Sequence, residues 1–204
     1  MTQLWKRLDI SQEDVRYILE DDHIYYAREY ISGRSYAASE ANNLIRNFKK
    51  PVDRKRLPEW RHKLLAIAKF AGEISRLLND NNEYVFAAIP TSKCKSDPEY
   101  DSRLEDTLTA LKRKKNNIII QEPISANQTM LPVHLGGTRD PEAIYRNQLW
   151  NGFNVETDQV ILIDDVLTWG SHFKAYKRMI LEHYPEMEII GIFWAKTIWD
   201  DADN

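Results

Sequence analysis

The sequence predicts an α/β sandwich built on a parallel sheet, and two observations in its second half carry this prediction. The first is a set of short apolar runs separated by polar or helical stretches, at residues 84–89, 118–120, 160–163 and 189–194. Runs of this length are typical of strands that are buried on both faces. The second is that residues 102–111 and 172–183 are long enough to form the crossover helices that parallel strands require. Regular alternation of strand and helix defines the α/β class.

The first 80 residues are predicted to be helical. Ser11, with Asp14 three residues later, has the pattern of a capping box in front of an apolar stretch that includes Ile18. Ser39 is a candidate N-cap for a short helix that reaches Phe48.

The longest helical pattern lies at residues 60–78, where apolar residues recur at three- and four-residue intervals. Pro58 precedes it, at a position where the first turn of a helix tolerates proline. The polar run at residues 80–82 ends the pattern. We therefore divide the chain into a helical N-terminal region, residues 1–80, and an α/β core, residues 81–204.

Composition excludes several classes of protein. With 43% hydrophobic and 29% charged residues, the chain is neither disordered nor collagen-like. Its single cysteine, Cys94, excludes an internal disulfide and a multi-cysteine metal site, and it suits a reducing compartment. Charged residues interrupt the first ten positions, and no apolar run approaches the roughly 20 residues of a membrane helix. We expect a soluble, cytoplasmic protein with no membrane partner.

The net charge of −3 is unevenly distributed. Residues 1–80 hold 15 Lys and Arg against 12 Asp and Glu, whereas residues 81–204 hold 13 against 19. A phosphorylated ligand bound in the second region would therefore need local donors and a metal ion, because the surface there is not broadly positive.

The most basic segment spans residues 46–63, with eight Lys and Arg against two acidic residues. Such a segment can bind a nucleic acid or an acidic protein, and an ordinary solvated surface is the alternative. The candidate partner-binding residues are Arg46, Lys49, Lys50, Arg54, Lys55 and Arg56.

Residues 160–172, which read V-I-L-I-D-D-V-L-T-W-G-S-H, are the most informative stretch for function. In an open parallel sheet, ligands bind beyond the carboxyl ends of the strands, and a glycine-containing loop at a helix start presents backbone N–H groups to a phosphate. Asp164 and Asp165 supply acceptors for a vicinal diol or a hydrated Mg²⁺, and Thr168 and Ser171 add hydroxyl donors. The stretch predicts recognition of a sugar phosphate; the alternative is an acidic pair that merely ends a strand.

This stretch resembles the motif of type I phosphoribosyltransferases that binds 5-phosphoribosyl-1-pyrophosphate (PRPP), an apolar strand followed by D-D-x-x-T-T-G-x-T. The resemblance implies a phosphoribosyltransferase-like sheet flanked by helices, with the N-terminal region as a helical extension. It implies that Asp164 and Asp165 are catalytic, contact the ribose hydroxyls and hold Mg²⁺ through water. The loop implied to bind the 5′-phosphate of the substrate comprises Thr168, Trp169, Gly170, Ser171 and His172.

Two residues of this loop depart from the motif. Trp169 and His172 stand where the family has hydroxyl residues, so two hydroxyl donors are absent. Trp169 can pack in the core, stack on a base or block the phosphate pocket, and His172 can bind phosphate when protonated or simply begin a helix.

A second stretch, residues 85–94 (V-F-A-A-I-P-T-S-K-C), resembles the strand and pyrophosphate loop of the same enzymes. This implies that Thr91, Ser92 and Lys93 contact pyrophosphate. Residues 145–153 are similar to the ComF-like branch of the family, although the cysteine-rich zinc segment of that branch is missing.

In the N-terminal region, N-N-L-I-R-N-F-K-K at residues 42–50 and P-E-W at residues 58–60 resemble phosphoribosyltransferase-type accessory proteins encoded beside bacterial retrons. That resemblance implies an anti-phage effector whose toxicity is restrained by a reverse transcriptase and its RNA–DNA product.

Two functions are therefore open. The first is a phosphoribosyltransferase that binds PRPP or a related phosphoribosyl ligand with Mg²⁺ and acts at ribose C1; a homodimer is a candidate assembly because homodimers are frequent in that fold. The second is a regulatory module that uses the same pocket as a sensor and docks on a protein or an RNA–DNA partner through the basic segment.

Overall fold

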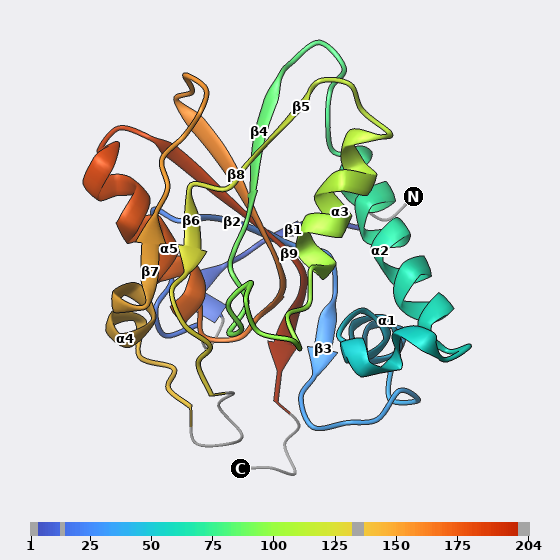
Figure 1. The fold of residues 1–204 in the computed structure, drawn as a ribbon. Coiled ribbons are helices and arrows are strands. Elements are labelled where there is room, and N and C mark those ends of the chain that lie inside the picture. Colours follow the sequence, from blue (N-terminus) through green and yellow to red (C-terminus); the bar gives the residue numbers. More distant parts are fainter. Residues whose placement is uncertain (1–3, 13–14, 132–136, 200–204) are drawn as a thin grey trace.

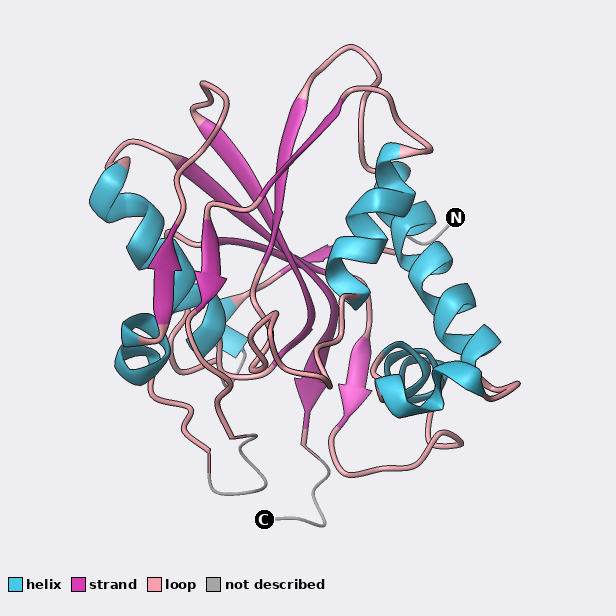
Figure 2. Ribbon diagram, in the orientation of Figure 1, coloured by secondary structure: helices cyan, strands magenta, loops and turns pink. Residues whose placement is uncertain are grey.

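The computed structural model describes residues 4–12, 15–131 and 137–199 and places helices on both faces of a central sheet (Figures 1 and 2). In chain order its elements are β1 (Lys6–Arg7), η1 (Ile10–Gln12), β2 (His23–Tyr26), β3 (Glu29–Ile31), α1 (Glu40–Phe48), η2 (Val52–Arg56), α2 (Trp60–Ser75), β4 (Tyr84–Ala88), α3 (Arg103–Lys112), β5 (Ile118–Gln121), β6 (Ile124–Ala126), α4 (Pro141–Arg146), β7 (Gln148–Trp150), β8 (Gln159–Leu167), α5 (Ser171–His183) and β9 (Glu188–Ile198).

The main sheet has the strand order β1-β2-β9-β8-β4-β5, and β3 also pairs with β9. Every pairing in it is parallel except that of β1 with β2. The predicted α/β class with a mostly parallel sheet and flanking helices is therefore confirmed. The second sheet in the described residues is a short antiparallel pair of β6 with β7.

The central strands are apolar throughout because each of their faces is covered. On β8, Ile161 and Ile163 pack into one core with α1, α2 and α3, whereas Val160 and Leu162 pack into another core with α5. Helices α2 and α3 lie on one side of the sheet and α5 on the other (Figure 1). Side chains on both faces must therefore be apolar, which explains the lack of alternation in the sequence.

The predicted helices between the strands are present as α3 and α5, and two of the helices predicted in residues 1–80 are present as α1 and α2. Helix α1 begins as the sequence indicates, because the Ser39 side chain accepts a hydrogen bond of 3.0 Å from the backbone N–H of Asn42.

The prediction that residues 1–80 are helical is wrong for several segments. Residues 23–26 and 29–31 form β2 and β3, which pair with β9, and residues 6–7 form β1, which pairs with β2. Residues 15–19 form no helix. Asp14 of the expected capping box lies outside the described residues, and Ser11 belongs to the short 3₁₀ turn η1. The region therefore contributes strands to the same sheet as the rest of the chain.

A tertiary contact explains why residues 23–26 form a strand. Ile24 is fully buried opposite Gly191 of β9, and a Cβ atom at Gly191 would lie 2.6 Å from the Cδ1 atom of Ile24. The strand thus depends on a distant glycine, and no local pattern could reveal it.

The topology creates a switch point between β4 and β8. Strand β4 leads through α3 to β5 on one side of the pair, and β8 leads through α5 to β9 on the other. Because α3 and α5 cover opposite faces, the chain diverges at the carboxyl ends of β4 and β8. Such a position in a parallel sheet is where ligands commonly bind. In the described part of the chain, no helix is long and apolar enough to cross a membrane.

Candidate functional site

A cavity of about 1180 Å³ lies beyond the carboxyl ends of β4 and β8. Its walls include both loops that the sequence analysis assigned to the ligand, together with two basic residues of α1 and the turn after it. The predicted site residues that line it are Arg46, Lys49, Thr91, Ser92, Lys93, Asp164, Asp165, Thr168, Trp169, Gly170, Ser171 and His172. Residues that are 70 or more positions apart in the sequence thus converge on one space.

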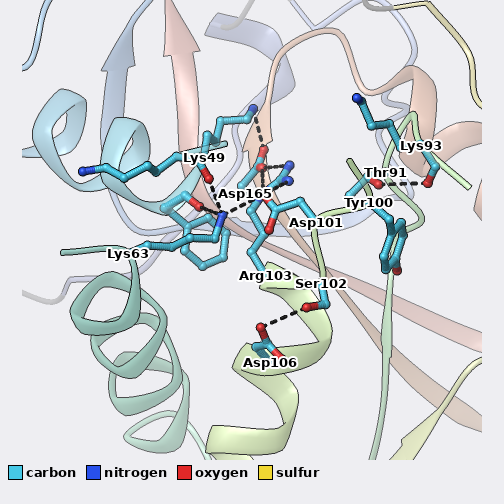
Figure 3. Close-up of polar contacts among 12 residues, drawn as sticks. Lys49, Lys63, Thr91, Lys93, Tyr100, Asp101, Ser102, Arg103, Asp106 and Asp165 are labelled. Atoms are coloured by element: carbon cyan, nitrogen blue, oxygen red, sulfur yellow. Dashed lines mark hydrogen bonds and ion pairs between the residues drawn. The ribbon is translucent and has the colours of Figure 1, made fainter. Parts of the chain in front are cut away.

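Asp165 is held by two cations (Figure 3). The Lys49 Nζ atom donates to its Oδ1 atom at 2.9 Å, and the Arg103 Nε and Nη2 atoms donate to its Oδ2 atom at 2.8 and 2.6 Å. The Asp165 side chain is only 5% exposed, whereas that of Lys49 is 46% exposed. Charged hydrogen bonds therefore engage both carboxylate oxygens of Asp165.

The same network continues to α2. The Asp101 Oδ2 atom accepts hydrogen bonds from Arg103 Nη1 at 2.9 Å and from Lys63 Nζ at 2.7 Å. Lys63 is 1% exposed, and its ammonium also donates to the carbonyl oxygens of Phe48 and Lys50 at 2.8 and 2.9 Å. Lys63 therefore has three acceptors for its three N–H groups and fixes the turn after α1 to α2.

The two adjacent carboxylates differ in acidity. Burial raises the pKa of Asp164 to about 7, and the charge of Asp165 adds to this effect. Burial acts in the same direction on Asp165, but Lys49 and Arg103 more than offset it and hold the pKa of Asp165 well below its usual range. Environments that separate the pKa values of two neighbouring acids are frequent in functional sites.

Asp164 is the more available acid. It is partly buried, and its Oδ1 atom accepts the backbone N–H of Asp165 at 2.7 Å. In the described residues, no cluster of three or more His, Cys, Asp or Glu side chains could hold a metal ion by itself. The donors fit Mg²⁺ only in the way common for phosphate substrates, with one carboxylate, waters and ligand oxygens completing the shell. Asp164 would be that carboxylate, acting through water.

The loop after β8 is shaped by its neighbours. Gly170 has a φ of +83°, and a Cβ atom there would lie 2.3 Å from Ile18 Cδ1, so both the backbone and the packing require glycine. The Thr168 hydroxyl is 2.9 Å from that of Thr197 on β9. Ser171 begins α5, so the first backbone N–H groups of this 13-residue helix lie at the cavity.

Trp169 lies between two arginines at the rim of the cavity. The guanidinium carbons of Arg16 and Arg139 are 4.0 and 4.1 Å from the centre of its ring, and its indole N–H is buried without a hydrogen-bond partner in the described residues. Such stacking fixes the ring in place. At the start of α5, burial lowers the pKa of His172, which favours the neutral imidazole.

The loop after β4 is held mainly by its own residues. The Thr91 hydroxyl donates to the carbonyl of Lys93 at 3.2 Å, and the carbonyl of Ser92 accepts the N–H of Met130 at 2.7 Å. The Lys93 ammonium forms an ion pair with Glu99. All three predicted residues line the cavity, but Lys93 would have to exchange Glu99 for a ligand to bind pyrophosphate.

The structure separates the six basic residues that were predicted to bind a partner. Arg46 and Lys49 line the cavity, and the Arg46 Nε atom donates to the carbonyl of Arg34 at 2.7 Å. Lys50 is 9% exposed and donates to the carbonyl of Glu59 at 3.1 Å. The other three lie on the exposed turn η2; they are Arg54, Lys55 and Arg56.

Sequence reasoning missed three residues of the charged network: Lys63, Asp101 and Arg103. For Lys63 a signal was available, since it lies four and seven residues before the buried Ile67 and Phe70 and so shares their helix face. For Arg103 no signal was available, because its partner Asp165 on β8 is more than 60 residues away. Asp101 gave none either, because its partner Lys63 lies on α2, 38 residues away.

A comparison of the chain with models of known protein families and with curated protein sequences finds no match.

Proposed function

We propose that this chain binds a phosphoribosyl ligand, PRPP or a ribose 5-phosphate nucleotide, in the cavity between β4 and β8 and acts at ribose C1. The observation that supports this most is the convergence of the loop at residues 91–93 with the stretch at residues 164–172 at the switch point of a parallel sheet. In this proposal the two loops supply donors for two separate phosphate groups, and Asp164 supplies an acid in the same cavity.

Each part of the cavity has a distinct task in this proposal. The backbone N–H groups of residues 170–172 would hold the 5′-phosphate at the start of α5. Asp164 would accept a ribose hydroxyl, and the loop at residues 91–93 would hold pyrophosphate. Bound Mg²⁺ would neutralise charge on the pyrophosphate.

The reaction would break the bond between C1 of the ribose and the pyrophosphate oxygen. A nucleophilic nitrogen or a water oxygen would form the new bond at C1, pyrophosphate would leave with the electron pair, and the acceptor would lose a proton. The protein accelerates such a step by holding both phosphate groups so that C1 faces the acceptor.

Calorimetric titration of PRPP into the protein in the presence of Mg²⁺ tests the proposal. We expect micromolar binding by the wild-type protein and a loss of about tenfold in Asp164→Asn, the order expected when a hydrogen bond to a charged acceptor is lost. Asparagine retains the oxygen that accepts the N–H of Asp165, so the substitution should spare the fold.

Asp158→Asn is the matched control, because Asp158 is exposed and directly precedes β8, at the opposite end of the strand from Asp164. Equal affinity of wild type and Asp164→Asn, or no binding of PRPP by folded wild-type protein, would overturn the proposal. Release of pyrophosphate from bound PRPP, with water or an added base as acceptor, then distinguishes an enzyme from a protein that only binds.

The second candidate is a regulatory module in which the cavity holds a nucleotide as a signal. The observation in its favour is that Asp165 is engaged by Lys49 and Arg103 and that Lys93 is paired with Glu99. The exposed basic residues of η2 would then contact a protein or an RNA–DNA partner, as expected for a retron-type effector. Partner binding that falls steeply with salt and is unchanged in Asp164→Asn would support this module.

A further inference from the structure

The charged network at the cavity wall consists of Lys49, Lys63, Asp101, Arg103 and Asp165, and only one of its side chains is well exposed to solvent. The side chains of Asp165, Arg103 and Asp101 are 5%, 13% and 15% exposed, and that of Lys63 is 1% exposed. Lys49 is 46% exposed. The network contains three cations and two carboxylates, and its accessible group is an ammonium.

The cations of the network also have N–H groups that its carboxylates do not use. An ammonium has three N–H groups and a guanidinium has five. Within the described residues, the hydrogen bonds of Lys49 use one of its three N–H groups, and those of Arg103 use three of its five. Both residues therefore have donors to spare beside the cavity that they line.

Asp165, in contrast, has little capacity left. A carboxylate offers about four acceptor positions, and Asp165 uses one on Oδ1 and two on Oδ2. A vicinal diol needs two acceptor positions in an accessible place. Asp165 is thus better suited to hold the two cations than to bind a sugar.

We infer that Lys49 and Arg103 form an anion-binding pair for a phosphate or pyrophosphate group of the ligand, and that Asp165 is the positioning residue that holds them. This inference rests on the proposed function, since it assigns part of the same cavity to the anionic portion of that ligand. It replaces the role of ribose acceptor that the family resemblance implies for Asp165, and leaves that role to Asp164.

Two adjacent cations on one carboxylate are well placed for this task. They are attached to the two oxygens of a single group, so their heads are neighbours, and Asp101 fixes the guanidinium from its other side. Because the side chains are already ordered, binding an anion costs little further conformational entropy. Arginine offers paired donors and lysine a point charge, a combination suited to phosphate oxygens.

The test is calorimetric titration of inorganic pyrophosphate, and separately of ribose 5-phosphate and PRPP, into the full chain. We expect Lys49→Met to weaken pyrophosphate binding on the order of tenfold, as for a lost charged hydrogen bond, and Lys49→Arg to stay within about threefold of wild type. Lys55→Met is the matched control, because Lys55 is exposed on η2 and does not line the cavity.

Asp165→Asn distinguishes positioning from sugar binding. As a positioning residue, Asp165 affects pyrophosphate, which has no sugar, and the double variant Lys49→Met, Asp165→Asn loses less than the sum of the two single losses. If Asp165 is instead a ribose acceptor, Asp165→Asn weakens PRPP and leaves pyrophosphate unchanged. Should Asp165→Asn fail to fold, the Lys49 series alone decides whether the anion pair exists.

The outcomes separate the two proposals. If PRPP binds but pyrophosphate binds equally well to Lys49→Met and wild type, or not at all to either, the inference is overturned and the proposed function stands. If pyrophosphate binding depends on Lys49 while PRPP does not bind, the anion pair stands and the proposed function fails.

Discussion

Helix α2 buries one charge near each of its ends, and the two charges have different surroundings. Near its start, Lys63 connects through Asp101 and Arg103 to Asp165 and the cavity. Near its end, Glu73 accepts hydrogen bonds of 2.8 Å to both oxygens from Arg28 and one of 2.6 Å from the indole of Trp194.

The cluster at Glu73 lies away from the cavity, although it also reaches the surface through Lys69, whose Nζ atom is 3.4 Å from the Glu73 Oε1 atom. Neither Glu73 nor Arg28 nor Trp194 lines the cavity, and Trp194 stacks on Phe70 at 4.9 Å in the core. Buried pairing of charges is therefore not in itself a sign of function in this protein. The distinguishing feature of the Asp165 network is that its cations Lys49 and Arg103 line the cavity, whereas Lys69, the exposed cation of the Glu73 cluster, does not.

The largest effect that would test this contrast is expected from Glu73→Gln. The substitution leaves the Arg28 guanidinium buried without its carboxylate, and breaking a buried pair in this way costs about 3 kcal/mol of unfolding free energy. Urea denaturation measures the loss, with Glu83→Gln, an exposed residue of the turn before β4, as control. A loss as small as that of the control would show that the cluster does not stabilise the fold, and any change in pyrophosphate affinity of the folded protein would contradict its separation from the cavity.

At the other end of the helix, Lys63→Met should cost about 2 kcal/mol. The variant removes the Lys63 donor from two carbonyl oxygens and leaves Asp101 with its hydrogen bond from Arg103. Because burial lowers the pKa of Lys63, desolvation of the ammonium already offsets part of what these bonds contribute. Unlike Glu73→Gln, this variant should also weaken pyrophosphate binding, because Asp101 holds Arg103. Urea denaturation and pyrophosphate titration check both, against the exposed Lys112→Met; unchanged affinity would separate Lys63 from the site.

Some elements of the fold can be predicted from local sequence patterns, and others cannot. Strands β4, β8 and β9 and helices α3 and α5 follow from local patterns, because each is specified by apolar residues that are close in the chain. Strands β2 and β3 were missed because they are specified by pairing with β9, and the small residue Gly191 that admits Ile24 is more than 160 positions away.

The candidate site divides in the same way. The stretch at residues 164–172 and the loop at residues 91–93 were found because the residues within each are contiguous and lie after strands. Arg103 gave no signal, because an arginine at the start of a helix is an ordinary surface residue in the sequence. Only the folded chain brings it into hydrogen-bond contact with Asp165. Lys49 was predicted as a partner-binding residue from local charge density, but the structure shows it turned into the cavity.

The two acids on β8 lead to a pH-dependent prediction of smaller size. The pKa of Asp164 is raised to about 7 by burial, against about 3.9 in an unfolded chain. Between these values the folded protein keeps a proton that the unfolded chain has released, so the contribution of Asp164 to stability falls as the pH rises through this window. From pH 6 to pH 8 we expect this contribution to fall by about 1.4 kcal/mol.

Asp164→Asn should remove that decline. Urea denaturation of wild type, Asp164→Asn and the control Asp158→Asn at both pH values isolates the difference, because His172 and the other titrating groups are common to all three proteins. A decline of the same size in Asp164→Asn as in wild type would show that Asp164 titrates normally.

The smallest effects are expected within the basic segment itself, where Lys50 and Lys55 differ only in their surroundings. Lys50 is buried and bonded to the carbonyl of Glu59, so Lys50→Gln should cost about 1 kcal/mol, the net value of one hydrogen bond. Lys55→Gln should change the unfolding free energy by less than about 0.5 kcal/mol, as for other exposed side chains. Urea denaturation distinguishes these values if the slopes of the two transitions agree.

Equal losses of unfolding free energy would mean that the segment acts as one exposed basic surface, and Lys50 would then again be a candidate for partner binding. Unequal losses would restrict that surface to the exposed turn η2.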